Sequence, residues 1–180
     1  MRCSITLMLF IFACVTAHAS VFEEACTSYE KDASRGQPEA MYKLGLIHIQ
    51  GQCGKPRNQS IGKELIKRAG NLGHSDAAYR YAQLAFDSGD ANKAKAWVQK
   101  AANLGNQQAL TYFGDEAYAV GDFETACYYY GVVLADKNNM HTTAWLDSYT
   151  QQTNVTRRLD DNKLHTCNTR VKLWKPAKTG

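Results

Sequence analysis

The sequence predicts an all-α protein, a right-handed α/α solenoid of about three repeats with helical caps, and three observations support this fold. Two similar stretches, RAGNLGHSDA at residues 68–77 and KAANLGNQQA at residues 100–109, begin thirty-two residues apart. Apolar residues recur at spacings of three and four, which places them on one face of a helix. Turns containing Gly-Asp separate the helical stretches. Self-similarity at such a period is typical of repeat proteins.

The first helix of each repeat follows a glycine. An alanine comes four residues after that glycine, and four residues further on a large apolar residue precedes a small one, which gives a neighbouring helix room to approach. In chain order these positions are Gly36, Ala40, Leu44 and Gly45, then Gly73, Ala77, Tyr81 and Ala82, then Gly105, Ala109, Phe113 and Gly114.

The second helix of each repeat follows a short turn. In SGDANKA at 88–94 and VGDFETA at 120–126, glycine ends the first helix, and Asp90 or Asp122 caps the next one. The second helix then carries its own apolar stripe and ends at the next glycine. The predicted repeats are residues 36–72, 73–104 and 105–136, with capping helices at 22–34 and 140–151. The predicted repeat domain as a whole spans residues 20–153.

Residues from both helices of a pair resemble the Sel-1-like repeat, a short α/α repeat related to the tetratricopeptide repeat. The resemblance is carried by AMYKLG at 40–45 and by KAKAWVQKAANLG at 93–105, and it extends over residues 36–136. It implies an interaction module that binds a peptide or partner domain in a concave groove, as an adaptor or scaffold. It implies no cofactor and no enzymatic activity.

The first residues predict export. Arg2 precedes an apolar run at residues 5–15 and the small-residue site Ala17-His18-Ala19, an order typical of a signal peptide at residues 1–19. The run is too short to span a bilayer, and no longer apolar stretch follows. Lipidation of Cys14 is the alternative. We therefore expect an exported protein without a transmembrane segment in its mature chain, periplasmic or, as an alternative, secreted.

Four cysteines follow the predicted signal peptide, and an even number in an exported chain indicates disulfides, with three possible pairings. No C-x-x-C motif indicates a metal site. In a stack of antiparallel helices the start of one helix lies near the end of the next, which favours Cys26–Cys53 and Cys127–Cys167, one pair at each end. Residues 154–180 carry seven basic and two acidic residues and are expected to form a basic tail tied by Cys167.

Enzyme-like motifs are few. Ser60 and Lys63 fit S-x-x-K, and Lys178-Thr179-Gly180 fits K-T-G, two motifs of penicillin-recognising serine enzymes, but S-D-N is missing. A cell-wall or β-lactam-acting enzyme is therefore the alternative to an interaction module. A secreted factor acting on host cells is the second alternative. The basic tail does not indicate nucleic acid in an exported protein.

The predicted groove lies on the first helices of the repeats, which line the concave side of such a stack. Tyrosine and arginine are favoured at the centres of binding interfaces. The partner is expected to be a protein or peptide of the cell envelope. The candidate groove residues are Tyr42, Lys43, Tyr79, Arg80, Gln83, Tyr112, Asp115 and Glu116.

Overall fold

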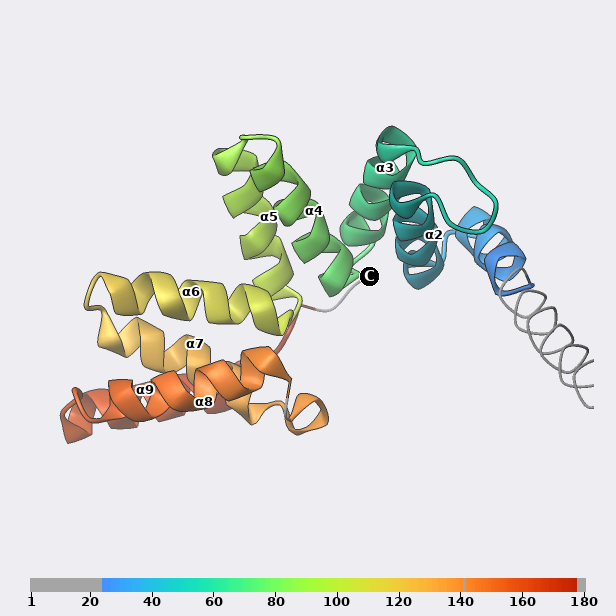
Figure 1. Ribbon diagram of the computed structural model, residues 1–180. Coiled ribbons are helices and arrows are strands. Elements are labelled where there is room, and N and C mark those ends of the chain that lie inside the picture. Colours follow the sequence, from blue (N-terminus) through green and yellow to red (C-terminus); the bar gives the residue numbers. More distant parts are fainter. Residues whose placement is uncertain (1–23, 141, 178–180) are drawn as a thin grey trace, which may run out of the picture. The chain divides into compact units, whose positions relative to one another are not determined.

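The computed structural model describes residues 24–140 and 142–177, so the predicted signal peptide and Lys178-Thr179-Gly180 lie outside the described residues. Within them the regular elements are helices, as the sequence predicts. Residues 24–34 are helical and precede α2 (Pro38–Gln50), α3 (Gln59–Asn71), α4 (Ser75–Asp87), α5 (Ala91–Asn103), α6 (Gln107–Ala119), α7 (Phe123–Ala135), the 3-10 turn η1 (Lys137–Asn139), α8 (Thr143–Thr156) and α9 (Asp161–Leu173) (Figure 1). The chain divides into two compact units, Met1–His74 and Ser75–Gly180.

In the first unit α2 packs against α3 through glycine. A Cβ atom added to Gly62 would lie 2.6 Å from the carbonyl oxygen of Gly45, so the two backbones touch. Ile66 is fully buried beside them. The loop between the two helices is joined to the preceding helix by the Cys26–Cys53 disulfide, whose Cα atoms are 6.2 Å apart, and by an ion pair of Lys55 with Glu30.

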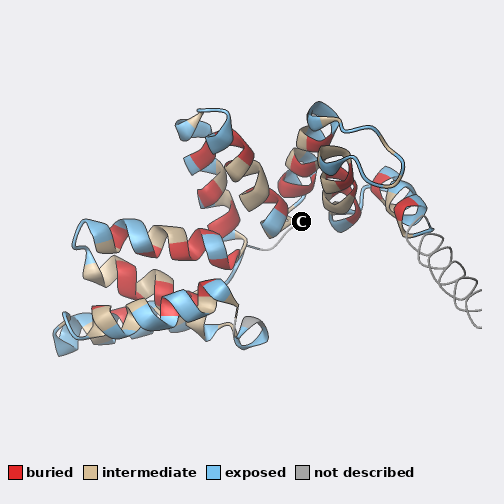
Figure 2. Cartoon of the chain, in the orientation of Figure 1, coloured by how far each residue is buried: buried red, intermediate tan, exposed pale blue. Residues whose placement is uncertain are grey.

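In the second unit α4 packs against α5 and α6 against α7, while α8 and α9 both pack against α7. The buried residues, coloured red in Figure 2, lie along the facing sides of these helices. Small residues are the commonest among these buried residues, because helices that pack closely leave little room for larger side chains. The main buried cluster consists of Ala78, Ala82, Val98, Ala101, Ala102, Ala109, Leu110, Val132 and Val133.

The turns between the helices have the predicted chemistry. Gly73 and Gly105, the glycines of the two similar stretches, have φ values of 91° and 88°, a left-handed conformation that favours glycine. Asp90 accepts a hydrogen bond from the backbone N–H of Lys93, and Asp122 accepts one from that of Thr125. Both aspartates are therefore N-caps, which stabilise the start of a second helix.

The C-terminal segment differs from the expected tail. Helix α8 continues to Thr156, beyond the predicted end at residue 151, and Asp161–Leu173 forms the additional helix α9. Asp160 caps α9 by accepting a hydrogen bond from Lys163 N–H. Leu164, Cys167 and Val171, at spacings of three and four, pack into the cluster on α7. Most residues of the segment are polar, so this narrow apolar stripe was not recognised in the sequence.

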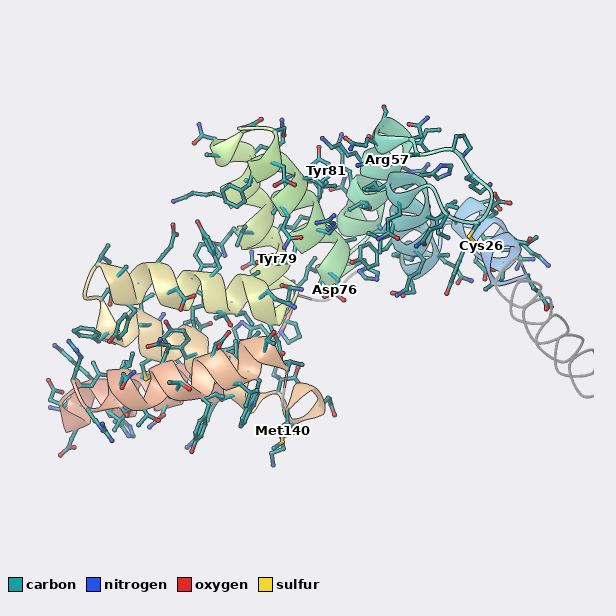
Figure 3. All side chains as sticks on the ribbon, in the orientation of Figure 1. Cys26, Arg57, Asp76, Tyr79, Tyr81 and Met140 are labelled. Carbon is teal, nitrogen blue, oxygen red and sulfur yellow. A yellow bond between two sulfur atoms is a disulfide. The ribbon has the colours of Figure 1, made fainter. Side chains whose placement is uncertain are left out.

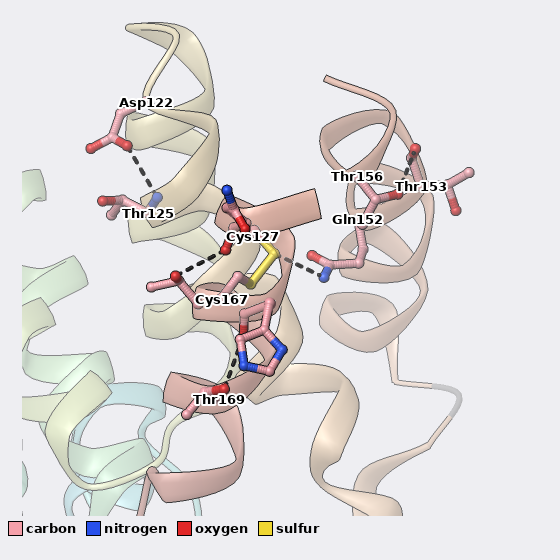
Figure 4. Close-up of a disulfide and its surroundings, with 11 residues drawn as sticks. Asp122, Thr125, Cys127, Gln152, Thr153, Thr156, Cys167 and Thr169 are labelled. Atoms are coloured by element: carbon pink, nitrogen blue, oxygen red, sulfur yellow. Dashed lines mark hydrogen bonds between the residues drawn. A yellow bond between two sulfur atoms is a disulfide. The ribbon is translucent and has the colours of Figure 1, made fainter. Parts of the chain in front are cut away.

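A second disulfide joins α7 to α9. Cys127 and Cys167 are both fully buried, and their Cα atoms are 6.1 Å apart. The amide nitrogen of Gln152 on α8 lies 3.5 Å from Cys127 Sγ (Figure 4). The two disulfides of the structure are thus the two pairs that the sequence predicts.

Candidate functional site

A shallow pocket of about 230 Å³ lies on α4, α6 and α8 in the second unit. Helix α4 carries the labelled Tyr79 in Figure 3. The sequence predicts groove residues on α4 and α6, but none on α8. Its lining consists of Tyr79, Gln108, Thr111, Tyr112, Asp115, Thr143, Ala144 and Asp147.

Helix α6 contributes the largest share of the lining. Gln108, Tyr112 and Asp115 follow one another at spacings of four and three, so they share one helical face. Thr111, on the same side, is buried, and its Oγ1 lies 3.1 Å from Oγ of the fully buried Ser148 on α8. This buried hydrogen bond holds α6 and α8 together beneath the pocket.

Tyr112 supplies an aromatic surface with a fixed hydroxyl group. Its ring packs edge-on against Phe113, with centroids 5.5 Å apart. Its hydroxyl donates to Glu116 Oε1 at 2.9 Å, and the same oxygen accepts a hydrogen bond from Lys95 Nζ at 2.9 Å. Burial, and then the bond to Glu116, raise the pKa of Tyr112. The hydrogen bond from Lys95 lowers the pKa of Glu116, so Tyr112 remains a neutral phenol beside an ionised carboxylate.

Asp115 connects the pocket to the core. Its Oδ1 accepts a hydrogen bond of 2.7 Å from the hydroxyl of Tyr130 on α7. Tyr130 is fully buried. Burial, and then the bond to Asp115, raise the pKa of Tyr130 far above its usual range. Asp115 itself is exposed, as is Asp147 on α8. The two charged residues of the lining are both acidic, so the pocket favours cations and hydrogen-bond donors.

The remaining predicted groove residues lie elsewhere. Arg80 donates to Oε1 of Gln83 at 3.0 Å, and neither side chain is part of the lining. Glu116 lies outside the lining as well and reaches it through Tyr112. The structure thus brings together Tyr79, Tyr112 and Asp115.

Tyr42 and Lys43 belong to the first unit. The ring of Tyr42 packs against His74 with a centroid distance of 4.8 Å, and Lys43 Nζ lies 5.8 Å from the centroid of the Tyr42 ring. Lys43 also pairs with Glu39 at 3.4 Å. Both predicted residues therefore contribute to packing and surface charge within their own unit.

Five lining residues were missed from the sequence: Gln108, Thr111, Thr143, Ala144 and Asp147. The spacing of Gln108, four residues before Tyr112, was an available signal. The contribution of α8 was not predictable from the repeat pattern, because the segment that contains α8 lies after the third repeat and was expected to be a cap.

Two further kinds of site are absent from the part of the chain that the structure describes. No cluster of three or more His, Cys, Asp or Glu side chains in these residues is arranged to hold a metal ion. Among the same residues, no helix has the length and apolar character needed to cross a membrane. Ser60 and Lys63 lie in the first turns of α3, with Ser60 exposed.

The stacked helical pairs, with a pocket on α4, α6 and α8, define an α/α repeat protein. Residues 38–74 and 75–106 each match the family model of the Sel1 repeat. Residues 38–106 therefore carry two Sel1-like repeats, which confirms the resemblance found in the sequence. Repeats of this class are helical scaffolds whose stacked surfaces serve protein interaction.

A solved structure shows the same fold. A Sel1 repeat protein from Oxalobacter formigenes matches with a TM-score of 0.59 and 23% sequence identity, over 83% of this chain and 64% of that chain. The chain thus spans less than two thirds of that protein. A protective antigen present in uropathogenic Escherichia coli strains, displaying an SLR fold, matches with a TM-score of 0.48 and 15% identity, over 86% of this chain and 43% of that chain. None of the curated proteins matches the chain significantly.

Proposed function

We propose that the chain is an exported interaction module that holds a peptide or partner domain against the pocket formed by α4, α6 and α8. The observation that carries this proposal is the convergence of α4, α6 and α8 on one pocket. A preformed surface limits the loss of conformational freedom on binding. Binding of this kind requires no covalent chemistry.

The lining indicates a basic partner segment. Asp115 and Asp147 are exposed carboxylates, and Tyr79 and Tyr112 present partly buried rings beside them. A lysine or arginine side chain that reaches such a pocket gains both an ion pair and attraction to an aromatic face. Gln108 and Thr143 add hydrogen-bonding groups for a main chain. The partner is therefore a protein segment that carries Lys or Arg.

Two disulfides support an oxidising compartment, because such bonds persist mainly in exported proteins. Together with the predicted signal peptide, they support export, and we propose a periplasmic location. We expect fractionation of producing cells to recover the oxidised protein with the periplasmic contents. Recovery from the medium would favour the secreted alternative.

The partner is best identified by a photo-crosslinking amino acid at Gln108, which is exposed within the pocket. The affinity of the purified partner is then compared between Asp147→Lys and Asp87→Lys, two charge reversals at exposed helical positions, of which only Asp147 lines the pocket. We expect Asp147→Lys to weaken binding about tenfold or more, the effect of losing an ion pair and adding repulsion, and Asp87→Lys to leave it unchanged. Equal effects of the two reversals would refute the assignment.

The neighbouring residues Tyr79 and Arg80 give a finer test. Tyr79 lines the pocket, whereas Arg80 bonds to Gln83 on the same helix. We expect Tyr79→Ala to weaken partner binding and Arg80→Ala to have little effect. The reverse result would move the interface to another face of α4.

A further inference from the structure

A second and larger cavity lies elsewhere in the second unit. It has a volume of about 570 Å³, within the range of pockets that hold small organic molecules. It is bounded by the turn before α6, the C-terminal half of α7, the end of α9 and the segment that follows α9. Its walls are mainly apolar and include Leu110, Val132, Val171 and Trp174. It has no lining residue in common with the pocket on α4, α6 and α8.

One wall carries a buried polar group without a partner. Gln107, the first residue of α6, is 8% exposed and lines the cavity. Its Oε1 accepts a hydrogen bond of 2.7 Å from Thr142 Oγ1. No group among the described residues accepts a hydrogen bond from its buried Nε2. A buried amide without an acceptor is unfavourable. Because Nε2 is inaccessible in the unliganded structure, the amide has to turn toward the cavity to meet a ligand oxygen, and the hydrogen bond that it gains favours this turn.

The charged groups of the cavity offset each other. Asp136 and Lys172 are the two ionisable residues of its lining. Asp136 also accepts a hydrogen bond from the backbone N–H of Asn138, which fixes its carboxylate at the end of α7. Because the lining carries one negative and one positive charge, it gives no net preference for an ion of either sign.

The chain's own C-terminal segment forms one wall. The backbone N–H of Ala177 donates to Asn103 O at 2.7 Å, which ties this segment to the end of α5. Cβ of Pro176 and the ring of Trp174 each lie 3.4 Å from the position of a Cβ added to Gly105. The aromatic wall is thus held against the turn before α6, and the cavity is part of the folded unit.

We propose that this cavity binds a small uncharged molecule with an apolar body and a carbonyl oxygen, such as an aromatic or branched aliphatic amide. The apolar body packs against the valine, leucine and tryptophan walls, and the carbonyl oxygen accepts a hydrogen bond from Gln107 Nε2. This site is independent of the proposed partner groove, since the two differ in every lining residue.

The test is a titration of the oxidised full-length protein, labelled with nitrogen-15, with three probes that have the same phenyl body. These are phenylacetamide, phenylacetate and phenethylamine, which end in an uncharged amide, a carboxylate and an ammonium group. We expect saturable shifts of the backbone resonances around the cavity, with phenylacetamide binding most tightly. Absence of saturable shifts, or tighter binding of either ion, would overturn the proposal.

Two substitutions locate the probe. Ala135 and Ala119 are the exposed last residues of α7 and α6, and only Ala135 lines the cavity. We expect Ala135→Phe, which narrows the cavity, to weaken phenylacetamide binding about tenfold, and Ala119→Phe, the matched control, to leave it unchanged. Equal affinity in both variants would place the probe elsewhere and overturn the proposal.

A third variant tests the hydrogen bond. Gln107→Leu keeps the approximate side-chain size and removes the amide, so it should weaken phenylacetamide about threefold to tenfold, the range of a single hydrogen bond. Toluene, which has no acceptor, serves as the control probe and should bind this variant as it binds the parent chain. Undiminished phenylacetamide affinity in Gln107→Leu would contradict the assigned role of Gln107, even if Ala135→Phe failed to fold.

Discussion

The first and third helical pairs use the same sequence position in two different ways. Gly45 in α2 and Gly114 in α6 each follow the large apolar residue of the first helix. In the first pair Gly45 allows α3 to approach, since a Cβ added to Gly45 would lie 2.7 Å from Ile66 Cγ1 and 3.0 Å from the carbonyl oxygen of Gly62. In the third pair Gly114 accommodates a ring, since its added Cβ would lie 2.5 Å from Tyr130 Cε1.

This difference links packing to the candidate site. The ring that Gly114 accommodates belongs to the tyrosine whose hydroxyl bonds to Asp115 in the pocket. A glycine at this repeat position therefore shows that the facing helix needs space there. The residues of the facing helix determine whether its backbone or a side chain occupies that space. In the third pair an aromatic side chain fills the space and orients a carboxylate on the surface, whereas in the first pair the same kind of position brings the helices themselves together.

The largest expected losses of stability come from removing the two disulfides. Cys127 and Cys167 are forty residues apart, against twenty-seven for Cys26 and Cys53. Replacing Cys127 and Cys167 by alanine should lower the free energy of unfolding of the second unit by about 3.9 kcal/mol, and the corresponding change in the first pair should cost about 3.6 kcal/mol, because the longer loop gains slightly more entropy when opened. Urea denaturation with hydrogen exchange measures both. A larger loss at Cys26 and Cys53 would contradict the loop argument.

Alanine at the two kinds of glycine should separate backbone contact from ring contact. Gly62→Ala places a Cβ against the carbonyl oxygen of Gly45, which cannot move aside, and should cost about 3 kcal/mol. Gly114→Ala meets the ring of Tyr130 and should cost about 2 kcal/mol, since a ring can tilt. Both values come from denaturation curves.

A double-mutant cycle checks the cause of the second effect. If the ring is responsible, Gly114→Ala should be less damaging in a Tyr130→Leu background than in the parent chain. Independent, additive losses would show that the ring of Tyr130 is not the obstacle.

The N-caps of the same two pairs should differ by a smaller amount. Asn58 caps α3 by accepting from Ile61 N–H, and Asn106 caps α6 by accepting from Ala109 N–H. Asn106 is also buried, and its amide donates to Asp76 at 2.8 Å. Asn58→Ala should therefore cost about 1 kcal/mol and Asn106→Ala about 2 kcal/mol in thermal or urea unfolding. Equal costs would show that the bond to Asp76 contributes little.

The smallest predicted effect is a dependence on pH in the first unit. The hydrogen bond between His74 and Glu39, 2.5 Å long, is the main cause that lowers the pKa of Glu39 from its usual 4.5. A lowered carboxyl pKa contributes stability above pH 4.5 that is lost as the pH falls through the lowered value. Because Glu39 is 61% exposed, the contribution should stay below about 1 kcal/mol. Glu39→Gln should therefore reduce the dependence of the free energy of unfolding on pH below pH 4.5, as measured by urea denaturation at several pH values. An unchanged dependence would exclude the Glu39–His74 pair as its source.

The features that could be predicted from the sequence are those fixed by the spacing of residues along the chain. Glycines with left-handed φ values, aspartate caps and small residues at helix contacts all follow local rules, so the helical pairs were predictable. Tyr79, Tyr112 and Asp115 could be assigned to the pocket side because repeat position fixes their helical face. Asp147 could not, because it depends on the packing of α8 against α6 and α7. Helix α9 was missed because most of its residues are polar.

Helix α9 makes the end of the chain depend on oxidation. Its single fully buried residue is Cys167, so the covalent bond to α7 is its strongest attachment. In a chain whose thiols are still reduced, we expect α9 to detach and trypsin to cut at Arg170 and Lys172, which are exposed basic residues. Resistance of the reduced chain would refute this. Because α9 supplies Val171 and Lys172 to the larger cavity, that cavity would then be completed only once the Cys127–Cys167 bond has formed, and a molecule that binds there would distinguish the oxidised from the reduced chain.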